Sequence, residues 1–143
     1  MQTIPVPKRV ITYEYYGAMA DTMVGRLRGE RFTHVYGIPR GGMPLAVHMS
    51  HHLGVPLVTS GEILTNMNLW TPDDRLLVVD DIINHGKSIS GIAHMLTIRK
   101  IKHLTAVLFY KSNATFKPDV YIETSDTWIV FPWEHEDEAP KHT

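Results

Sequence analysis

A run of apolar residues followed by two acids and a small polar loop constrains the fold of this chain more than any other feature. The apolar run Leu76–Val79 predicts a short buried strand, and Asp80 and Asp81 lie at its carboxyl end. The loop Asn84–Ser88 follows and leads into a helical stretch, Ile89–Ile98. In open α/β sheets, ligands bind outside the carboxyl ends of the strands. We therefore expect a ligand site at this point of the chain.

The polar loop and the paired acids offer two kinds of binding group side by side. A loop that enters a helix presents free backbone N–H groups and the positive end of the helix dipole, which suit a phosphate. Neighbouring carboxylates suit sugar hydroxyls or a hydrated Mg²⁺ ion, whose ligands are oxygen atoms. The stretch therefore predicts a phosphorylated sugar as ligand.

The same stretch has two competing interpretations. Gly86-Lys87-Ser88 is like the end of a P-loop, but that motif needs a glycine five residues before its Gly-Lys pair, and Asp81 stands there. An acid at that position would point negative charge at a triphosphate, which disfavours a nucleoside triphosphatase. The other interpretation is a buried strand that ends in an ordinary acidic turn before a capped helix.

Composition narrows the class of protein. With 143 residues, 43% of them hydrophobic, the chain is long enough for one domain with a buried core. The formal net charge of −1 gives no basic surface to hold nucleic acid or an anionic membrane. Zero cysteines exclude disulfides and Cys-ligated metal centres. There is no signal-peptide pattern and no membrane-spanning run, so we expect a cytoplasmic protein.

Strands alternate with helices along the chain, which predicts a single domain, residues 1–143, with a mostly parallel twisted sheet flanked by helices. The expected helices are Tyr13–Leu27, Pro44–Leu53 and Ile89–Ile98. The expected strands are Phe32–Ile38, Val55–Thr59, Leu76–Val79, Leu104–Tyr110, Val120–Ile122 and Thr127–Phe131. We expect an irregular arm over residues 1–10, a long loop or short hairpin over Gly61–Arg75, and a disordered tail over residues 135–143.

A glycine-rich segment, Gly37–Gly42, follows the first strand of the predicted sheet. Gly41 and Gly42 let the backbone come close to a ligand, and Arg40 offers a planar fork that suits phosphate oxygens. The alternative is a plain strand-to-helix turn with a surface arginine.

The late part of the chain combines a lysine, aromatic rings and an acid. Lys111 ends a predicted strand at the same sheet edge as Asp80, and Asp126–Glu134 contains Trp128. A lysine can donate to an exocyclic oxygen of a nucleobase, and an aromatic ring can stack on the base. Core packing of the tryptophan is the competing interpretation.

The stretch from Leu76 to Ser88 resembles the phosphoribosyl-pyrophosphate (PRPP) signature of the type I phosphoribosyltransferases. That signature has four apolar residues, two acids, two apolar residues, a variable residue, Thr-Gly, any residue and then Thr or Ser. Asp80, Asp81 and Gly86 match it, as does Ser88. The resemblance extends over nearly the whole chain and implies the fold of that family, with a small C-terminal hood that binds the base.

Two residues depart from the pattern. His85 replaces the usual threonine of the signature. Asn84 stands where the 6-oxopurine branch of the family normally carries an aspartate, and an amide cannot ionise. At this position the chain therefore has no group that could accept a proton as the aspartate of that branch does.

The resemblance also implies roles for individual residues in the PRPP site. Gly37–Gly42 resembles the pyrophosphate loop, which often has a cis peptide bond before its basic residue, here between Pro39 and Arg40. The residues implied to act in catalysis are Asp80, Asp81, Asn84 and Arg40. Those implied to bind PRPP are Arg40, Gly41, Gly42, Asp80, Asp81, Asn84, His85, Gly86, Lys87 and Ser88.

The segment Asp126–Glu134 is similar to one in bacterial xanthine-guanine phosphoribosyltransferases. The similarity implies that Lys111 reads the purine O6, that Trp128 stacks on the ring and that the backbone of Ile129 contacts the base edge. Glu134 falls where a late aspartate of that branch helps to order the metal and pyrophosphate. Mg²⁺ is the implied cofactor, with Asp80, Asp81 and Glu134 as its implied ligands.

The resemblance implies an enzyme of purine salvage that transfers the phosphoribosyl group from PRPP to a 6-oxopurine and releases pyrophosphate. Relatives usually associate, so a homodimer or homotetramer is expected. Two alternatives stay open. One is a ligand-binding regulator that keeps the fold without turnover. Two features favour it: the amide of Asn84, and the shortness of Gly61–Arg75, since the family's mobile hood over the active site is usually long. The other is a phosphoribosyltransferase for a pyrimidine base.

Three histidines, His48, His51 and His52, allow two imidazoles on one helical face. The metalloprotease motif His-Glu-x-x-His needs a glutamate after the first histidine, and Met49 stands there instead. Without a nearby acidic third ligand, we expect a solvated helix face.

Overall fold

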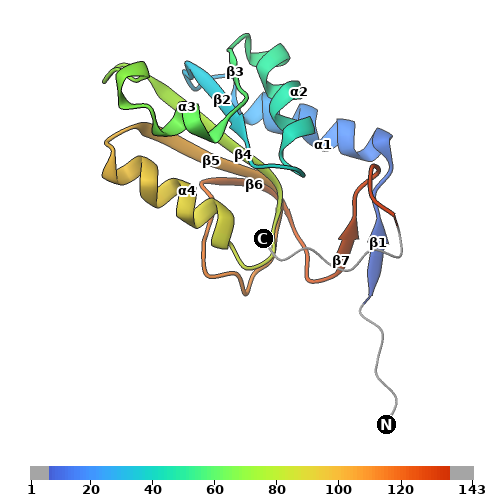
Figure 1. Cartoon of the computed structure of the whole chain (residues 1–143). Helices are drawn as coiled ribbons and strands as arrows, with labels where there is room; N and C mark the ends of the chain where they lie inside the picture. Colours follow the sequence, from blue (N-terminus) through green and yellow to red (C-terminus); the bar gives the residue numbers. More distant parts are fainter. Residues whose placement is uncertain (1–6, 136–143) are drawn as a thin grey trace.

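The computed structural model describes residues 7–135, which form a five-stranded sheet, a two-stranded sheet and helices on both faces of the larger sheet (Figure 1). All strands of the larger sheet pair in parallel, in the order β3-β2-β4-β5-β6. The predicted class, a mostly parallel sheet flanked by helices, is therefore confirmed. The elements in chain order are β1 (Lys8–Val10), α1 (Tyr13–Leu27), β2 (His34–Gly37), α2 (Met43–Leu53), β3 (Leu57–Val58), α3 (Gly61–Thr65), the 3₁₀ helix η1 (Met67–Leu69), β4 (Arg75–Ile83), α4 (Lys87–Ile98), β5 (Lys102–Tyr110), β6 (Val120–Thr124) and β7 (Trp128–Val130).

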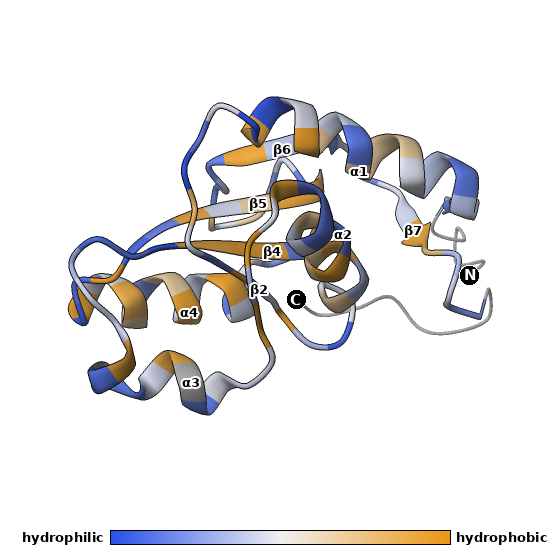
Figure 2. Ribbon diagram, turned by 90° about the horizontal axis from the view of Figure 1, so that it is seen from above, coloured by the Kyte–Doolittle hydropathy of each residue, from blue (hydrophilic) through white to orange (hydrophobic). Residues whose placement is uncertain are grey.

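The sheet lies between two helical layers. Seen from above, α1 and α2 lie on one side of it, and α3 and α4 on the other (Figure 2). The central strand β4 buries side chains on both faces: Leu77 and Val79 join the core under α1 and α2, whereas Leu76 and Val78 join the core under α3 and α4. A parallel strand covered on both faces has continuous apolar sequence, as the run Leu76–Val79 has.

The first long helix follows the expected bounds. α1 spans Tyr13–Leu27, and the Thr12 hydroxyl accepts a hydrogen bond of 3.0 Å from the backbone N–H of Tyr15 at its start. This cap satisfies one of the N–H groups that a helix leaves without a partner in its first turn. Among residues 7–135, no helix combines the length and the apolar character that crossing a bilayer requires.

The acidic pair lies inside a strand that is longer than expected. β4 continues to Ile83, beyond the predicted end at Val79, because its pairing with β5 persists through Asp80 opposite Val107 and Ile83 opposite Tyr110. The apolar run ends at Val79, but β4 stays covered on both faces beyond the acids, since Ile82 joins one core and Ile83 the other. As a result, both acids lie within β4, and the loop begins only after Ile83.

The segment Gly61–Arg75 was expected to be a loop or hairpin, and that expectation is wrong. It contains α3 and η1. The Ser60 hydroxyl accepts a bond of 3.1 Å from the Glu62 N–H at the start of α3, and Leu64 is fully buried. Five residues are too few to display a helical period in the sequence. The buried Leu64 and the hydrogen bond to the Ser60 hydroxyl stabilise this helix.

The expected irregular arm is also partly wrong. Lys8–Val10 form β1, which pairs in parallel with β7 in the register Lys8 opposite Trp128 and Val10 opposite Val130. Two segments from opposite ends of the sequence therefore build the small second sheet, a pairing that no local pattern reveals. Residues 1–6 of the expected arm and residues 136–143 of the expected tail lie outside the described part of the chain.

Candidate active site

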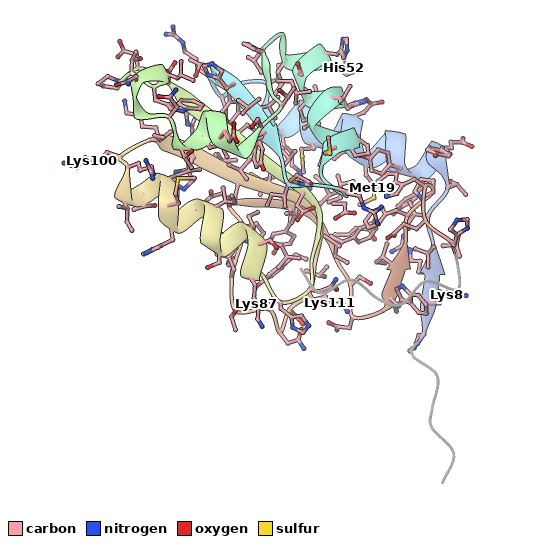
Figure 3. The ribbon with its side chains drawn as sticks, in the orientation of Figure 1. Lys8, Met19, His52, Lys87, Lys100 and Lys111 are labelled. Atoms are coloured by element: carbon pink, nitrogen blue, oxygen red, sulfur yellow. The ribbon has the colours of Figure 1, made fainter. Side chains whose placement is uncertain are left out.

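Parallel pairing brings three segments to one edge of the sheet. The N–H of Ile38, just after β2, donates to the carbonyl of Val79 in β4 at 3.0 Å. The N–H of Lys111, just after β5, donates to the carbonyl of Ile83 at 3.1 Å. The glycine-rich segment, the acidic pair and Lys111 are thus adjacent, as the strand order requires. Figure 3 shows Lys87 and Lys111 at the same end of the molecule.

Both acids of the pair are buried: Asp80 is 3% exposed and Asp81 0%. Each carboxylate accepts a hydrogen bond of 2.8 Å from the backbone N–H of the next residue, Asp81 or Ile82. These bonds hold the two side chains against their own strand. Carboxylate oxygens of this kind are suitable ligands for sugar hydroxyls and for Mg²⁺.

Tyr16, on the buried face of α1, is a residue of the site that the sequence did not reveal. Burial, together with the negative charge of Asp81, raises the pKa of its hydroxyl well above the usual value. That hydroxyl is buried and has no hydrogen-bond partner in the part of the chain that the structure describes. Tyr16 therefore stays a neutral donor beside the acidic pair. Its helical position indicated only a core residue, and the approach to Asp81 depends on how α1 lies on the sheet.

Steric fit shapes the glycine-rich loop between β2 and α2. A Cβ atom on Gly37 would lie 2.4 Å from the carbonyl oxygen of Gly42, and one on Gly42 would lie 2.6 Å from the carbonyl oxygen of Val79. These glycines let the loop close against β4. The expected approach of Gly41 and Gly42 to a ligand stays a prediction. The peptide bond between Pro39 and Arg40 is cis, as the family resemblance implied. The Arg40 side chain is exposed and forms no hydrogen bond or ion pair with any residue among 7–135.

The loop after β4 leads directly into α4. Asn84 is 7% exposed, His85 is exposed, and Gly86 is the N-cap of the helix. Because glycine has no side chain to bond the first turn of α4, the N–H groups of that turn are available to an anion. Lys87 and Ser88, both exposed, complete this turn.

Gly86→Ala is expected to destabilise the protein strongly. Gly86 has a φ of +89°, and an added Cβ would lie 2.6 Å from the Cβ of Phe116. Gly54 is the matched control, since its φ is +69° but nothing lies within 4 Å of an added Cβ. We expect Gly54→Ala to cost about 1 kcal/mol of unfolding free energy from the left-handed backbone alone. Gly86→Ala should cost about 1–3 kcal/mol more from overpacking.

Urea unfolding of both variants measures the difference. Equal losses at Gly86 and Gly54 would mean that the segment around Phe116 moves aside freely. In that case the loop before α4 is not held in shape by Phe116.

The expected base-binding residues lie on two different sheets. Lys111 follows β5, whereas Trp128 and Ile129 are in β7. Two hydrogen bonds join the neighbourhoods: Ser125 N–H to the Tyr110 carbonyl at 3.1 Å, and the Ser112 hydroxyl to Asp126 at 3.3 Å. They bring the segment before Trp128 close to Lys111.

Trp128 is half-buried, and the Lys8 ammonium lies 5.6 Å from the centre of its ring, at one face. The Trp128 N–H donates to Pro7, and the Val130 carbonyl accepts from Ile11, each at 2.8 Å. Because alternate residues of a strand bond to one neighbour, the peptide groups of Ile129 point away from β1. The Ile129 side chain itself is in the core.

Glu134 lies in a turn that follows β7. One of its carboxylate oxygens accepts a 2.9 Å bond from the Phe131 N–H, and its own N–H donates to the Phe131 carbonyl at 2.9 Å. This carboxylate thus has a local structural partner. Its expected role near a metal stays a prediction.

Solved structures of other proteins have a fold similar to that of this chain. No family model matches the chain. A purine phosphoribosyltransferase from Pyrococcus horikoshii Ot3 is similar, with 24% identity, a TM-score of 0.79, and 94% of this chain and 99% of that chain covered. A Helicobacter pylori xanthine-guanine-hypoxanthine phosphoribosyltransferase has 24% identity and a TM-score of 0.74, with 89% and 93% covered.

A third similar structure is a hypothetical protein from Neisseria gonorrhoeae with bound ppGpp, at 18% identity and a TM-score of 0.78, with 94% of this chain and 93% of that chain covered. All three likenesses extend over nearly the full length of both chains. With its parallel sheet in the order β3-β2-β4-β5-β6 and these structural likenesses, the chain has the fold of the type I phosphoribosyltransferases.

Proposed function

We propose that the protein transfers the phosphoribosyl group of PRPP to a 6-oxopurine base and releases pyrophosphate. One observation carries the proposal: the acidic pair of β4, the loop that contains Arg40 and the uncapped start of α4 adjoin one sheet edge. Together they offer groups for a ribose, a pyrophosphate and a 5′-phosphate. A homodimer or homotetramer is the assembly expected of such an enzyme.

The chain's own residues would fix the sugar on both sides of its reacting carbon. The N–H groups at the start of α4 would hold the 5′-phosphate, and Asp80 and Asp81 would accept bonds from the ribose hydroxyls. Fixing the ribose at two points removes much of the entropy cost of bringing it to the base. The acidic pair is held for this task by its own strand, because each carboxylate accepts a hydrogen bond from the backbone N–H of the next residue.

The leaving group needs positive charge. As the bond from the anomeric carbon to pyrophosphate breaks and a bond to a ring nitrogen of the base forms, the pyrophosphate takes the electron pair. Arg40 and the backbone of the glycine-rich loop would bind its oxygens. A bound Mg²⁺ ion would add charge neutralisation, and the carboxylates of Asp80, Asp81 and Glu134 have the oxygen donors that it prefers.

The base would lie between β5 and β7. Lys111 would donate to the purine O6, the half-buried Trp128 would stack on the ring, and the outward peptide groups of Ile129 would contact the base edge. With these contacts the site would favour a 6-oxopurine over a pyrimidine, the other base class that the sequence leaves open.

Trp128→Ala is expected to weaken binding of the base by about 1–3 kcal/mol, the usual value of one stacking contact. Affinity for PRPP should stay nearly unchanged, because in this proposal the sugar and phosphates would bind at β4 and α4. Calorimetric titration of each substrate measures the two effects, and Trp128→Phe is the control that keeps an aromatic face. Equal losses for both substrates would identify Trp128 as a structural residue of the β1–β7 sheet.

A second candidate function is a regulator that binds its ligand without turnover. The amide of Asn84 in place of an acid favours it. A similar structure with bound ppGpp, a guanine nucleotide that carries phosphates at both ends, adds support. Such a ligand would use the same phosphate-binding groups as PRPP.

A turnover assay with PRPP, Mg²⁺ and a panel of purine and pyrimidine bases distinguishes the candidates. Release of pyrophosphate with guanine, xanthine or hypoxanthine supports the proposed enzyme, and release with uracil or orotate supports the pyrimidine alternative. Binding of PRPP or ppGpp without consumption of any base supports the regulator.

A further inference from the structure

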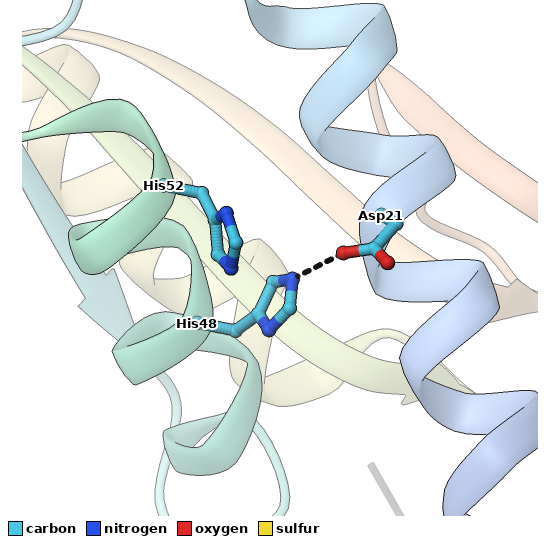
Figure 4. A group of neighbouring side chains, drawn as sticks. All are labelled: Asp21, His48 and His52. Atoms are coloured by element: carbon cyan, nitrogen blue, oxygen red, sulfur yellow. Dashed lines mark hydrogen bonds and ion pairs between the residues drawn. The ribbon is translucent and has the colours of Figure 1, made fainter.

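Three side chains from two helices form a compact cluster on the surface of the α1–α2 layer. Asp21 of α1 is exposed, as is His52 of α2, and His48 of α2 is half-buried. The His48 Nε2 lies 3.0 Å from the Asp21 Oδ1, and the two imidazole rings lie 4.2 Å apart at an angle of 31°. Figure 4 shows the carboxylate facing the pair of rings across the gap between the helices.

The structure supplies the ligand that the sequence lacked. Two histidines at positions i and i+4 of a helix lie on one face, as the ligands of helical zinc motifs do. The sequence offered no acid near His48 and His52, so a solvated face was expected. Asp21 lies 27 residues before His48, and the contact between α1 and α2 brings it there.

The donor atoms are close to the geometry of a metal site. The cluster offers one ligand atom from each residue, and all three lie within 4.8 Å of one another. Zinc bonds of about 2.0–2.2 Å in a tetrahedral arrangement place ligand atoms about 3.3 Å apart. The ligand atoms of Asp21 and His48 are already close to this separation. A change of side-chain rotamer that moves the ligand nitrogen of the exposed His52 by about 1–1.5 Å would complete the set, given the same bond lengths.

We propose that Asp21, His48 and His52 bind one Zn²⁺ ion, which cross-links α1 to α2. Two imidazole nitrogens and one carboxylate oxygen form a donor set that zinc accepts and that Mg²⁺, which prefers oxygen, does not. The exposure of the cluster lets water complete the coordination. In the folded chain without metal, the His48–Asp21 hydrogen bond holds two of the ligands together.

The site is separate from the candidate active site. In Figure 3, His52 lies at the far end of the molecule from Lys87 and Lys111. The effect of the bound ion would be structural. Because α2 starts directly after Gly42, the ion would tie the helix that follows the glycine-rich loop to α1. An ion that binds only the folded chain also raises the temperature of unfolding.

Titration of Zn²⁺ into the untagged full chain, with excess Mg²⁺ to fill oxygen-only sites, tests the proposal. We expect the wild type to bind one equivalent that Asp21→Asn, His48→Gln and His52→Gln each weaken at least about tenfold. Loss of even a partner outside the coordination sphere costs 10–100-fold in metal affinity. The matched control is His51→Gln, an exposed histidine of the same helix outside the cluster, which should bind as the wild type does.

Thermal unfolding gives a second measure. Zn²⁺ should raise the midpoint of the wild type and of His51→Gln, and should leave that of the triple variant Asp21→Asn, His48→Gln, His52→Gln unchanged. Zinc binding that is the same in the wild type and the triple variant overturns the proposal. So does binding that needs the histidines but is unaffected by Asp21→Asn, because the carboxylate is then only an ion-pair partner of His48.

Discussion

The double variant Asp80→Asn, Asp81→Asn is expected to lose detectable turnover and to stay folded. Each carboxylate would accept a charge-assisted hydrogen bond from the ribose, worth about 1.5–3 kcal/mol against a neutral partner. Removing both charges should lower kcat/KM by about 10²–10⁴-fold, since 1.4 kcal/mol is a factor of ten. Steady-state kinetics with PRPP and a 6-oxopurine measures the loss.

The free energy of unfolding of this variant should not fall, because asparagine can keep the hydrogen bonds that each aspartate makes with the backbone. Each carboxylate bonds to the N–H of the next residue through Oδ1, and an asparagine amide oxygen can accept the same bond. Both groups are buried, and burying a neutral amide costs less than burying a charge. The urea midpoint is therefore expected to stay the same or to rise, which separates lost chemistry from lost folding.

The control is a second pair of adjacent aspartates, Asp73 and Asp74, which come just before the opposite end of β4. Asp73 is exposed, and Asp74 accepts a 2.8 Å hydrogen bond from the Thr71 N–H, which lowers the pKa of the Asp74 carboxyl. Asp73→Asn with Asp74→Asn removes two charges of the same kind far from the site. Turnover should be retained there, with a small loss of stability. Normal turnover in the Asp80/Asp81 variant would contradict the proposed ribose contacts.

The local part of the candidate site was predictable from the sequence, and the part built by long-range packing was not. Asp80, Asp81 and Gly86 belong to one stretch whose strand, loop and helix follow from apolar runs and a glycine. Tyr16 lies on the buried face of α1 and Asp21 on its exposed face, a division that follows the helical period. Nothing in that period says that the charge of Asp81 acts on Tyr16 or that Asp21 contacts His48, because both depend on how two elements dock.

The fold shows the same division. The helix Tyr13–Leu27 was predicted to the residue, because it is long, amphipathic and capped by Thr12. β4 was predicted too short, because pairing with β5 holds the acids in the strand against their low strand propensity. β1 has no pattern of its own, since three residues become a strand only when β7 lies beside them.

Asn84→Asp is expected to raise the turnover number on a 6-oxopurine by at least about tenfold. In the 6-oxopurine branch that the sequence resembles, an acid at this position lies near N7 of the purine and accepts the proton that the base loses. The amide of Asn84 can accept a hydrogen bond there but cannot take the proton. General base catalysis is typically worth about 10²–10⁴ in rate, and imperfect placement of a new group argues for a gain below that range.

Burial makes position 84 well suited to a base. Asn84 is 7% exposed and lies three residues after the buried Asp81. Burial raises the pKa of a carboxyl group, and a base works best when its pKa is near the working pH. The gain from Asn84→Asp should therefore appear as pH rises through the raised pKa, because only the ionised form accepts a proton. The pH profile of the turnover number measures this.

The same raised pKa predicts a cost that an exposed acid would not have. Asn68→Asp, on the exposed surface of η1, adds the same charge away from the site and should change neither turnover nor stability. Asn84→Asp should lose stability at high pH, where the introduced carboxyl must ionise in a buried position. A variant that shows this loss, binds both substrates and turns over no faster would place residue 84 in the site but exclude it as the limiting proton acceptor. The proton would then leave to water or to the exposed His85, and the amide would be sufficient for the reaction.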